Sequence, residues 1–179
     1  CMVVAGLLGW VNSITKDKIA AITWEKTVTA MKEVISADDF SDAMDLTDDM
    51  TAAATAQGGT LAAVYQAQSG GQPIGYAINV ESSGSQGTIS MMVGIDMDGA
   101  VTGVSIVTNS ETSGIGSKVM GNEPLTNGTG VLDQFIGKSA ADGTLSVGSN
   151  VDAITGATVS TKGVTTGVNA ALAVAGVIG

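Results

Sequence analysis

Alternating apolar and polar residues in the middle of the chain predict a β-sheet. Four runs with this period of two are bounded by turn residues, over 61–68, 73–80, 88–95 and 100–108. Asp98-Gly99 separates the last two runs and favours a tight two-residue hairpin, whose central residues both need positive φ. Short connections of this kind join antiparallel strands, so we expect an antiparallel sheet. In the last run the alternation does not decide which face is buried.

Apolar residues at helical spacing predict helices before and after this sheet. The first runs from Ile19 to about Ile35, and the last follows Thr158 near the end of the sequence. A short helical turn is expected over 132–136. The apolar positions of the two helices are Trp24, Val28, Met31 and Ile35 in the first and Val164, Val168, Leu172 and Ala175 in the last. These elements predict an α+β fold, with an antiparallel sheet flanked by helices.

Residues 37–59, between the first helix and the first strand, are rich in aspartate. A calcium-binding loop would need a glycine at its central turn position and a bidentate glutamate at its end, and this segment has neither in place. We therefore interpret the segment as a solvated acidic surface. The aspartates are Asp38, Asp39, Asp42, Asp45, Asp48 and Asp49.

Residues 1–11 form an uninterrupted apolar run that turns polar at Asn12. A helix needs about 20 apolar residues to cross a bilayer, so this run is too short to span one alone. Because it begins at Cys1, without an initiator methionine, we interpret it as the outer end of a truncated transmembrane helix over residues 1–14. A buried core helix and a lipidated Cys1 are the alternatives.

Composition excludes several classes of function. The 179 residues carry a net charge of −10, with seven lysines and no arginine, so the chain lacks a basic surface for a nucleic-acid backbone. Without histidine, and with Cys1 as its single cysteine, it has no ligand set for zinc, haem or an iron–sulfur cluster. No glycine fingerprint for NAD follows a predicted strand. The length fits one domain with a sizeable core.

One run carries the candidate chemistry, and it reads Asp152-Ala153-Ile154-Thr155-Gly156-Ala157-Thr158. Gly156 permits backbone angles that other residues resist and Ala157 adds little bulk, so another molecule can reach the Thr158 hydroxyl. Free N–H groups at the start of the following helix would favour a phosphate there. The alternative is an ordinary helix N-cap, because Ser, Thr or Asp commonly precedes an apolar helical run.

This run resembles the Asp-x-x-(Ser/Thr)-Gly-Ala-Thr motif of the FMN-binding domain family. In that family a dedicated flavin transferase joins FMN through its phosphate to the last threonine. The resemblance therefore implies that Thr158 carries covalent FMN and that Asp152 serves in recognition by the transferase. It also implies that Thr155, Gly156 and Ala157 belong to the cofactor site. The redox chemistry would be that of the flavin, while the protein supplies position and electrostatics.

A second block is similar to the same family, in the order seen in the G subunits of Rnf complexes and the C subunits of sodium-pumping NADH:quinone reductases. The similarity spans roughly residues 60–172. Within it, the loop from Glu111 to Gly116 is implied to lie at the flavin ring, through Glu111, Thr112, Gly114 and Gly116. The other matching positions are Val64-Tyr65, Gly75-Tyr76-Ala77, residues 87–96 and Asp98-Gly99.

The resemblance implies a membrane-anchored electron-transfer flavoprotein subunit of an Rnf-type ferredoxin:NAD oxidoreductase coupled to ion translocation, rather than a stand-alone enzyme. Its partners would be the other subunits of a membrane redox complex and a flavin transferase, with the flavin domain on the extracytoplasmic side of the cell membrane. The segments would be 1–14 as the membrane helix, 15–59 as connector helix and acidic segment, and 60–179 as the FMN-binding domain. The equivalent quinone-reductase subunit and a flavin-free surface binding module are the alternatives.

Overall fold

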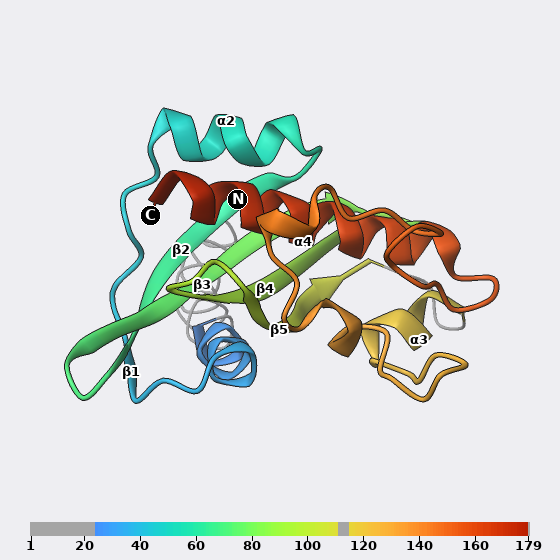
Figure 1. Cartoon of the computed structure of the whole chain (residues 1–179), viewed down its shortest axis with the longest axis horizontal. Helices are drawn as coiled ribbons and strands as arrows, with labels where there is room; N and C mark the ends of the chain where they lie inside the picture. The colour runs from blue at the N-terminus through green and yellow to red at the C-terminus, as the bar shows by residue number, and fades with distance from the viewer. Residues whose placement is uncertain (1–23, 111–114, 179) are drawn as a thin grey trace, which may run out of the picture.

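The computed structural model describes residues 24–110 and 115–178, and its centre is a five-stranded antiparallel sheet with the order β1-β2-β3-β4-β5 (Figure 1). Each strand pairs with the next one in the chain. The four predicted strands are confirmed to within a few residues at their ends, and β1 is an additional short strand. The bounds are Asp39–Phe40 for β1, Thr60–Ser69 for β2, Gln72–Ser83 for β3, Thr88–Asp96 for β4 and Val101–Asn109 for β5.

The hairpin between β4 and β5 is confirmed, whereas the predicted turn with two central residues at positive φ is wrong. Gly99 has a φ of 81° and donates its N–H to the Asp96 carbonyl at 3.1 Å, which makes Asp98 a central residue of the turn. Among the described residues other than glycine, only Asn122 has positive φ, so Asp98 is not left-handed. The connection is therefore a turn that ends with a left-handed glycine.

Helices cover both faces of the sheet. One face packs against helical residues 24–34, which confirms the described part of the predicted first helix. The other face packs against α4 (Thr158–Ile178), and α2 (Asp48–Ala56) lies beside α4 (Figure 1). The predicted α+β architecture, an antiparallel sheet flanked by helices, is confirmed.

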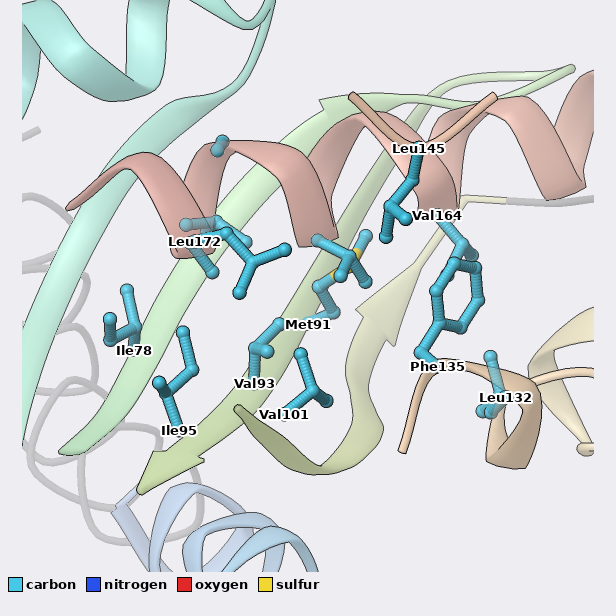
Figure 2. Close-up of a cluster of buried hydrophobic side chains, with 14 of the residues drawn as sticks. Ile78, Met91, Val93, Ile95, Val101, Leu132, Phe135, Leu145, Val164 and Leu172 are labelled. Carbon is cyan, nitrogen blue, oxygen red and sulfur yellow. The ribbon is translucent and has the colours of Figure 1, made fainter. Parts of the chain in front are cut away.

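Strand β4 lies at the centre of the core because both of its faces are buried. Met91, Val93 and Ile95 point to the side of α4, and Figure 2 shows them in one cluster with Leu172 of α4. Met92 belongs instead to the cluster under helical residues 24–34. Burial on both faces explains why β4 reads as a nearly continuous apolar run.

Glycines allow α4 to lie close to the sheet. A Cβ atom added at Gly163 would lie 2.6 Å from the Ser83 carbonyl oxygen, and one added at Gly167 would lie 2.6 Å from Cε of Met91. The Gly163 carbonyl also accepts a hydrogen bond of 2.8 Å from the buried Ser82 hydroxyl. A larger residue at either position would therefore displace the helix or its neighbours.

Helix α4 is also the one helix in the described part of the chain that is long and apolar enough to cross a membrane. More than half of it is buried inside the protein, so we assign it as the core helix of the fold. The transmembrane helix expected over residues 1–14 lies outside the described residues. The helix that is long and apolar enough to cross a membrane, α4, is thus at the opposite end of the chain from the predicted transmembrane helix.

The acidic segment contains a helix that was not predicted. Helix α2 begins after Thr47, whose hydroxyl accepts the N–H of Met50 at 3.3 Å, and Asp48 and Asp49 lie in its first turn. A hydroxyl cap and acidic residues both stabilise a helix N-terminus. Met50 and Ala54 join the core cluster next to α4, while the six aspartates of the segment are largely exposed, as predicted.

Candidate functional site

The run from Asp152 to Thr158 forms a tight corner directly before α4. The Ala157 N–H donates to the Ile154 carbonyl at 2.9 Å, and Gly156, with φ of 84°, takes the left-handed conformation that the third position of such a turn requires. The Ala157 carbonyl then accepts the N–H of Thr161 at 2.9 Å. Ala157 is therefore the N-cap of α4, and Thr158 is its first residue.

The corner faces solvent and is anchored from beneath. Asp152, Thr155 and Thr158 are exposed, whereas the Ala157 side chain is only 3% exposed and belongs to the core cluster. Thr155 lies within the turn itself. The structure thus places Thr158 at the surface, on a main chain that the Ala157 methyl group fixes to the core.

The helix start at this run differs in one respect from an ordinary capped start. The residue at the N-cap is Ala157, which has no side-chain oxygen to accept the N–H groups of the first turn. The helix dipole gives the start of a helix a partial positive charge. A phosphate on Thr158 fits this position, because it would bring acceptor oxygens and negative charge to the start of α4.

Asp152, at the beginning of the run, is held through its main chain. Gln134 of η1 (Asp133–Phe135) accepts the Asp152 N–H at 2.8 Å and donates to the Asp152 carbonyl at 2.9 Å. Because η1 is a short 3-10 helix, it confirms the helical turn expected over 132–136. Gln134 was not predicted to belong to the site, because 18 residues separate it from Asp152 and no local pattern links the two.

Lys162 is a second residue beside Thr158 that was not predicted from the sequence. It lies four residues after Thr158 in α4, and both side chains are exposed. Residues at this spacing share a helix face, and helical side chains lean toward the N-terminus. Lys162 and Thr158 therefore lie on the same face of α4. The spacing between Thr158 and Lys162 is visible in the sequence and could have identified this residue.

The second predicted part of the site is described only in part. Glu111, Thr112 and Gly114 lie outside the described residues. Gly116 is in α3 (Ile115–Met120), so the expectation that it belongs to a loop is wrong. The helix conformation follows Gly114 directly and continues into residues that pack on the core, including the fully buried Val119.

A groove of about 510 Å³ lies between helical residues 24–34 and β5. Within it the Glu33 carboxylate accepts a hydrogen bond of 2.6 Å from the Ser105 hydroxyl. No residue from the 152–158 run lines this groove. Helical residues 24–34 and α4 cover opposite faces of the sheet, so the groove and the corner at Thr158 are separate features.

Comparison with known proteins agrees with this geometry. Residues 84–173 match the model of the FMN-binding domain, and the match includes β4, β5, the 152–158 run and most of α4. The chain is 34% identical, over 96% of its length and 84% of the relative's, to the G subunit of the Na(+)-translocating ferredoxin:NAD(+) oxidoreductase complex of Acetobacterium woodii.

Two further relatives carry similar names. The G subunit of the ion-translocating oxidoreductase complex of Methanosarcina acetivorans is 30% identical over 95% of this chain and 86% of its own length. The G subunit of the proton-translocating ferredoxin:NAD(+) oxidoreductase complex of Clostridium ljungdahlii is 36% identical over 60% of this chain and 57% of its own length. Together with the exposed Gly-Ala-Thr corner, these matches show that the chain belongs to the FMN-binding domain family.

Proposed function

We propose that the chain is the FMN-carrying electron-transfer subunit of an Rnf-type membrane complex, which couples electron transfer between ferredoxin and NAD to ion translocation. The observation that carries the proposal is the exposed Thr158 at the start of α4, inside the region that matches the FMN-binding domain. The names of the relatives favour this complex over a quinone reductase. Two of those names specify different ions, sodium and protons, so we propose ion translocation without assigning the ion.

We propose that Thr158 holds FMN as a phosphoester. The Thr158 hydroxyl oxygen forms a bond to phosphorus while a phosphoanhydride bond of an activated flavin nucleotide breaks. The second phosphate group leaves with the bonding electrons, the hydroxyl proton passes to a base of the transferase, and no oxidant is needed. The ester keeps one ionisable phosphate oxygen, and the N-terminus of α4 stabilises one such charge by about 0.3–1 kcal/mol.

The remaining residues of the 152–158 run shape and present the attachment point. Thr155 and Gly156 form the turn, and the buried Ala157 fixes it to the core. Asp152 places an exposed carboxylate at the beginning of the same corner, where the transferase recognises it. The corner is thus both the substrate of the maturation enzyme and the later cofactor site.

The loop over 111–114 lines the flavin ring in this proposal, through Glu111, Thr112 and Gly114, with Gly116 at the start of α3. The described residue before the loop supports this position. The N–H of Ser110 donates to the Thr88 carbonyl at 3.1 Å, next to the turn between β3 and β4. Gly163 of α4 approaches the same turn, at Ser83. The described chain before residue 111 therefore ends close to the half of α4 that begins with Thr158.

Bound FMN would supply one-electron and two-electron redox chemistry, while the chain supplies position and burial. We propose that residues 1–14 end a transmembrane helix, that 15–59 lead away from it, and that 60–179 carry the flavin outside the cytoplasm. A covalent bond at Thr158 keeps the cofactor where no cytoplasmic FMN can replace it. The partners are the other subunits of the complex and a flavin transferase.

Matched valine substitutions test the attachment site. The full chain is co-expressed with its transferase as wild type, Thr158→Val and Thr155→Val, and each protein is examined by intact mass and by flavin fluorescence in denaturing gels. Valine keeps the shape of threonine and removes the hydroxyl, so Thr158→Val should lose all covalent FMN while Thr155→Val retains it. Covalent fluorescence in Thr158→Val, or an unmodified wild type, would contradict the proposal.

A further inference from the structure

The side-chain amide of Gln134 makes a closed pair of hydrogen bonds with the main chain of Asp152. Its oxygen accepts the Asp152 N–H at 2.8 Å, and its nitrogen donates to the Asp152 carbonyl at 2.9 Å. The same nitrogen donates to the Val131 carbonyl at 2.8 Å. Both protons of the amide group and its oxygen are therefore engaged, which fixes the orientation of the group.

Gln134 itself sits on a rigid base. The next residue, Phe135, is fully buried and lies beside Val164 of α4 (Figure 2). At the start of η1, the amide of Asn122 accepts the Leu132 N–H at 2.7 Å and donates to the Asp133 carboxylate at 2.9 Å. The position of Gln134 is thus set by the core and not by the surface corner that it contacts.

These contacts fix the corner at both of its ends. Gln134 holds Asp152 at one end, and at the other Ala157 is buried and begins α4. The exposed residues between them therefore have little freedom in the free protein. Restricting a reacting group before binding lowers the entropy that must be lost when it meets an enzyme.

We propose that Gln134 is a positioning residue for the modification of Thr158, acting by holding the 152–158 corner in the shape that the flavin transferase binds. This inference rests on the proposed attachment of FMN to Thr158. Gln134 touches neither Thr158 nor the transferred group. It acts through the main chain of Asp152, so its removal should slow modification even in a fully folded protein.

The structure contains a matched control for the stability that such hydrogen bonds contribute. The amide of Asn169 in α4 accepts the Leu145 N–H at 2.9 Å and donates to the Leu145 carbonyl at 2.9 Å. This pair has the same chemistry and the same half-buried type of side chain, but it holds a segment outside the 152–158 run. Loss of either pair should lower the free energy of unfolding to a similar extent.

The test compares Gln134→Met with Asn169→Leu, each of which keeps approximate side-chain volume and removes one amide pair. Full-length proteins are prepared without flavin and modified by the transferase at a temperature well below the unfolding midpoint of every variant. The rate of covalent flavin incorporation is measured against protein concentration. We expect Gln134→Met to lower kcat/KM for modification roughly tenfold, mainly through a higher KM, and Asn169→Leu to leave kcat/KM close to wild type.

Two further variants separate the possible failures. Gln134→Glu keeps the acceptor for the Asp152 N–H and loses the donor, so it should give an intermediate rate and provides a folded variant if Gln134→Met does not fold. Wild-type kinetics in Gln134→Met, or equal slowing in Asn169→Leu, would overturn the role of Gln134. Modification of Thr158→Val, or none of the wild type, would instead overturn the attachment site itself.

Discussion

Replacing Gly163 by alanine tests how closely α4 must lie on the sheet. The added methyl group would lie 2.6 Å from the Ser83 carbonyl oxygen and 3.2 Å from Cα of Gly84. Both are main-chain atoms, which cannot rotate away as a flexible side chain can. The Gly163 carbonyl also accepts the buried hydrogen bond from Ser82, at 2.8 Å. The substitution therefore forces a shift of the helix half that begins at Thr158.

Three effects set the size of the change in the free energy of unfolding. Alanine in a helix interior is favoured over glycine by about 1 kcal/mol. Overpacking costs about 1–3 kcal/mol, and strain on the Ser82 hydrogen bond about 1 kcal/mol more. Gly163→Ala should therefore destabilise the protein by about 2 kcal/mol.

Urea unfolding with linear extrapolation measures this change. Gly176→Ala is the control in the same helix, because a methyl group there meets nothing within 4 Å. It should be neutral or stabilise the protein by up to about 1 kcal/mol. A Gly163→Ala protein as stable as the wild type would refute the argument that main-chain contact at this glycine holds α4 in place.

Two other substitutions test charges at the surface. At low salt, Lys162→Gln should lower the free energy of unfolding of the FMN-carrying protein by about 0.5 kcal/mol more than that of the flavin-free protein, and high salt should remove this difference. Equal losses of stability in the two forms would exclude contact between Lys162 and the phosphate. Lys138→Gln is the control substitution. Hydrogen bonds from the Ser69 hydroxyl at 2.7 Å and the Gly70 N–H at 3.1 Å lower the pKa of the Asp38 carboxyl in the folded protein. The ionised carboxylate therefore stabilises the folded state at any pH above the pKa that Asp38 has in the unfolded chain. This stabilisation is lost as the pH falls through the lower pKa of the folded state. The urea midpoint of wild type should therefore exceed that of Asp38→Asn at neutral pH and approach it in acid, whereas a difference independent of pH would contradict this assignment.

The sheet was largely predictable from sequence because its strands are long and their turns are short. The two missed elements have weak local signals. Strand β1 has only 2 residues, too few to show a period. Helix α2 has 9 residues, mostly alanine, threonine and aspartate, and only Met50 and Ala54 are buried. Its cap at Thr47 and the acidic first turn were the available signals. The turn after β4 was misread because its left-handed glycine follows the central residues.

The candidate site likewise has one part that could be predicted from consecutive residues and one part that depends on the packing of distant segments. The corner at Thr158 is formed by consecutive residues, so the motif alone indicated that the Thr158 hydroxyl would be exposed, although the Thr155 side chain is exposed as well. The identity of the N-cap was not evident from the motif, and the hydrogen bond from the Thr161 N–H to the Ala157 carbonyl identifies it as Ala157. The contact of Gln134 with Asp152 depends on how η1 and α4 pack on the sheet, which no local pattern contains.

The course of α4 limits how a flavin on Thr158 could travel. The helix is unbroken from Thr158 to Ile178, and Val164 and Val168 are fully buried against the sheet. The link between the flavin and Thr158, here called the tether, is therefore attached to a helix that has no hinge of its own. Travel between an electron donor and an acceptor would come either from rotation about the single bonds of the tether, within nanoseconds, or from displacement of the whole domain, in microseconds to milliseconds. Only the second kind of motion is slow enough to limit the turnover of the complex and thereby to make that turnover sensitive to solvent viscosity.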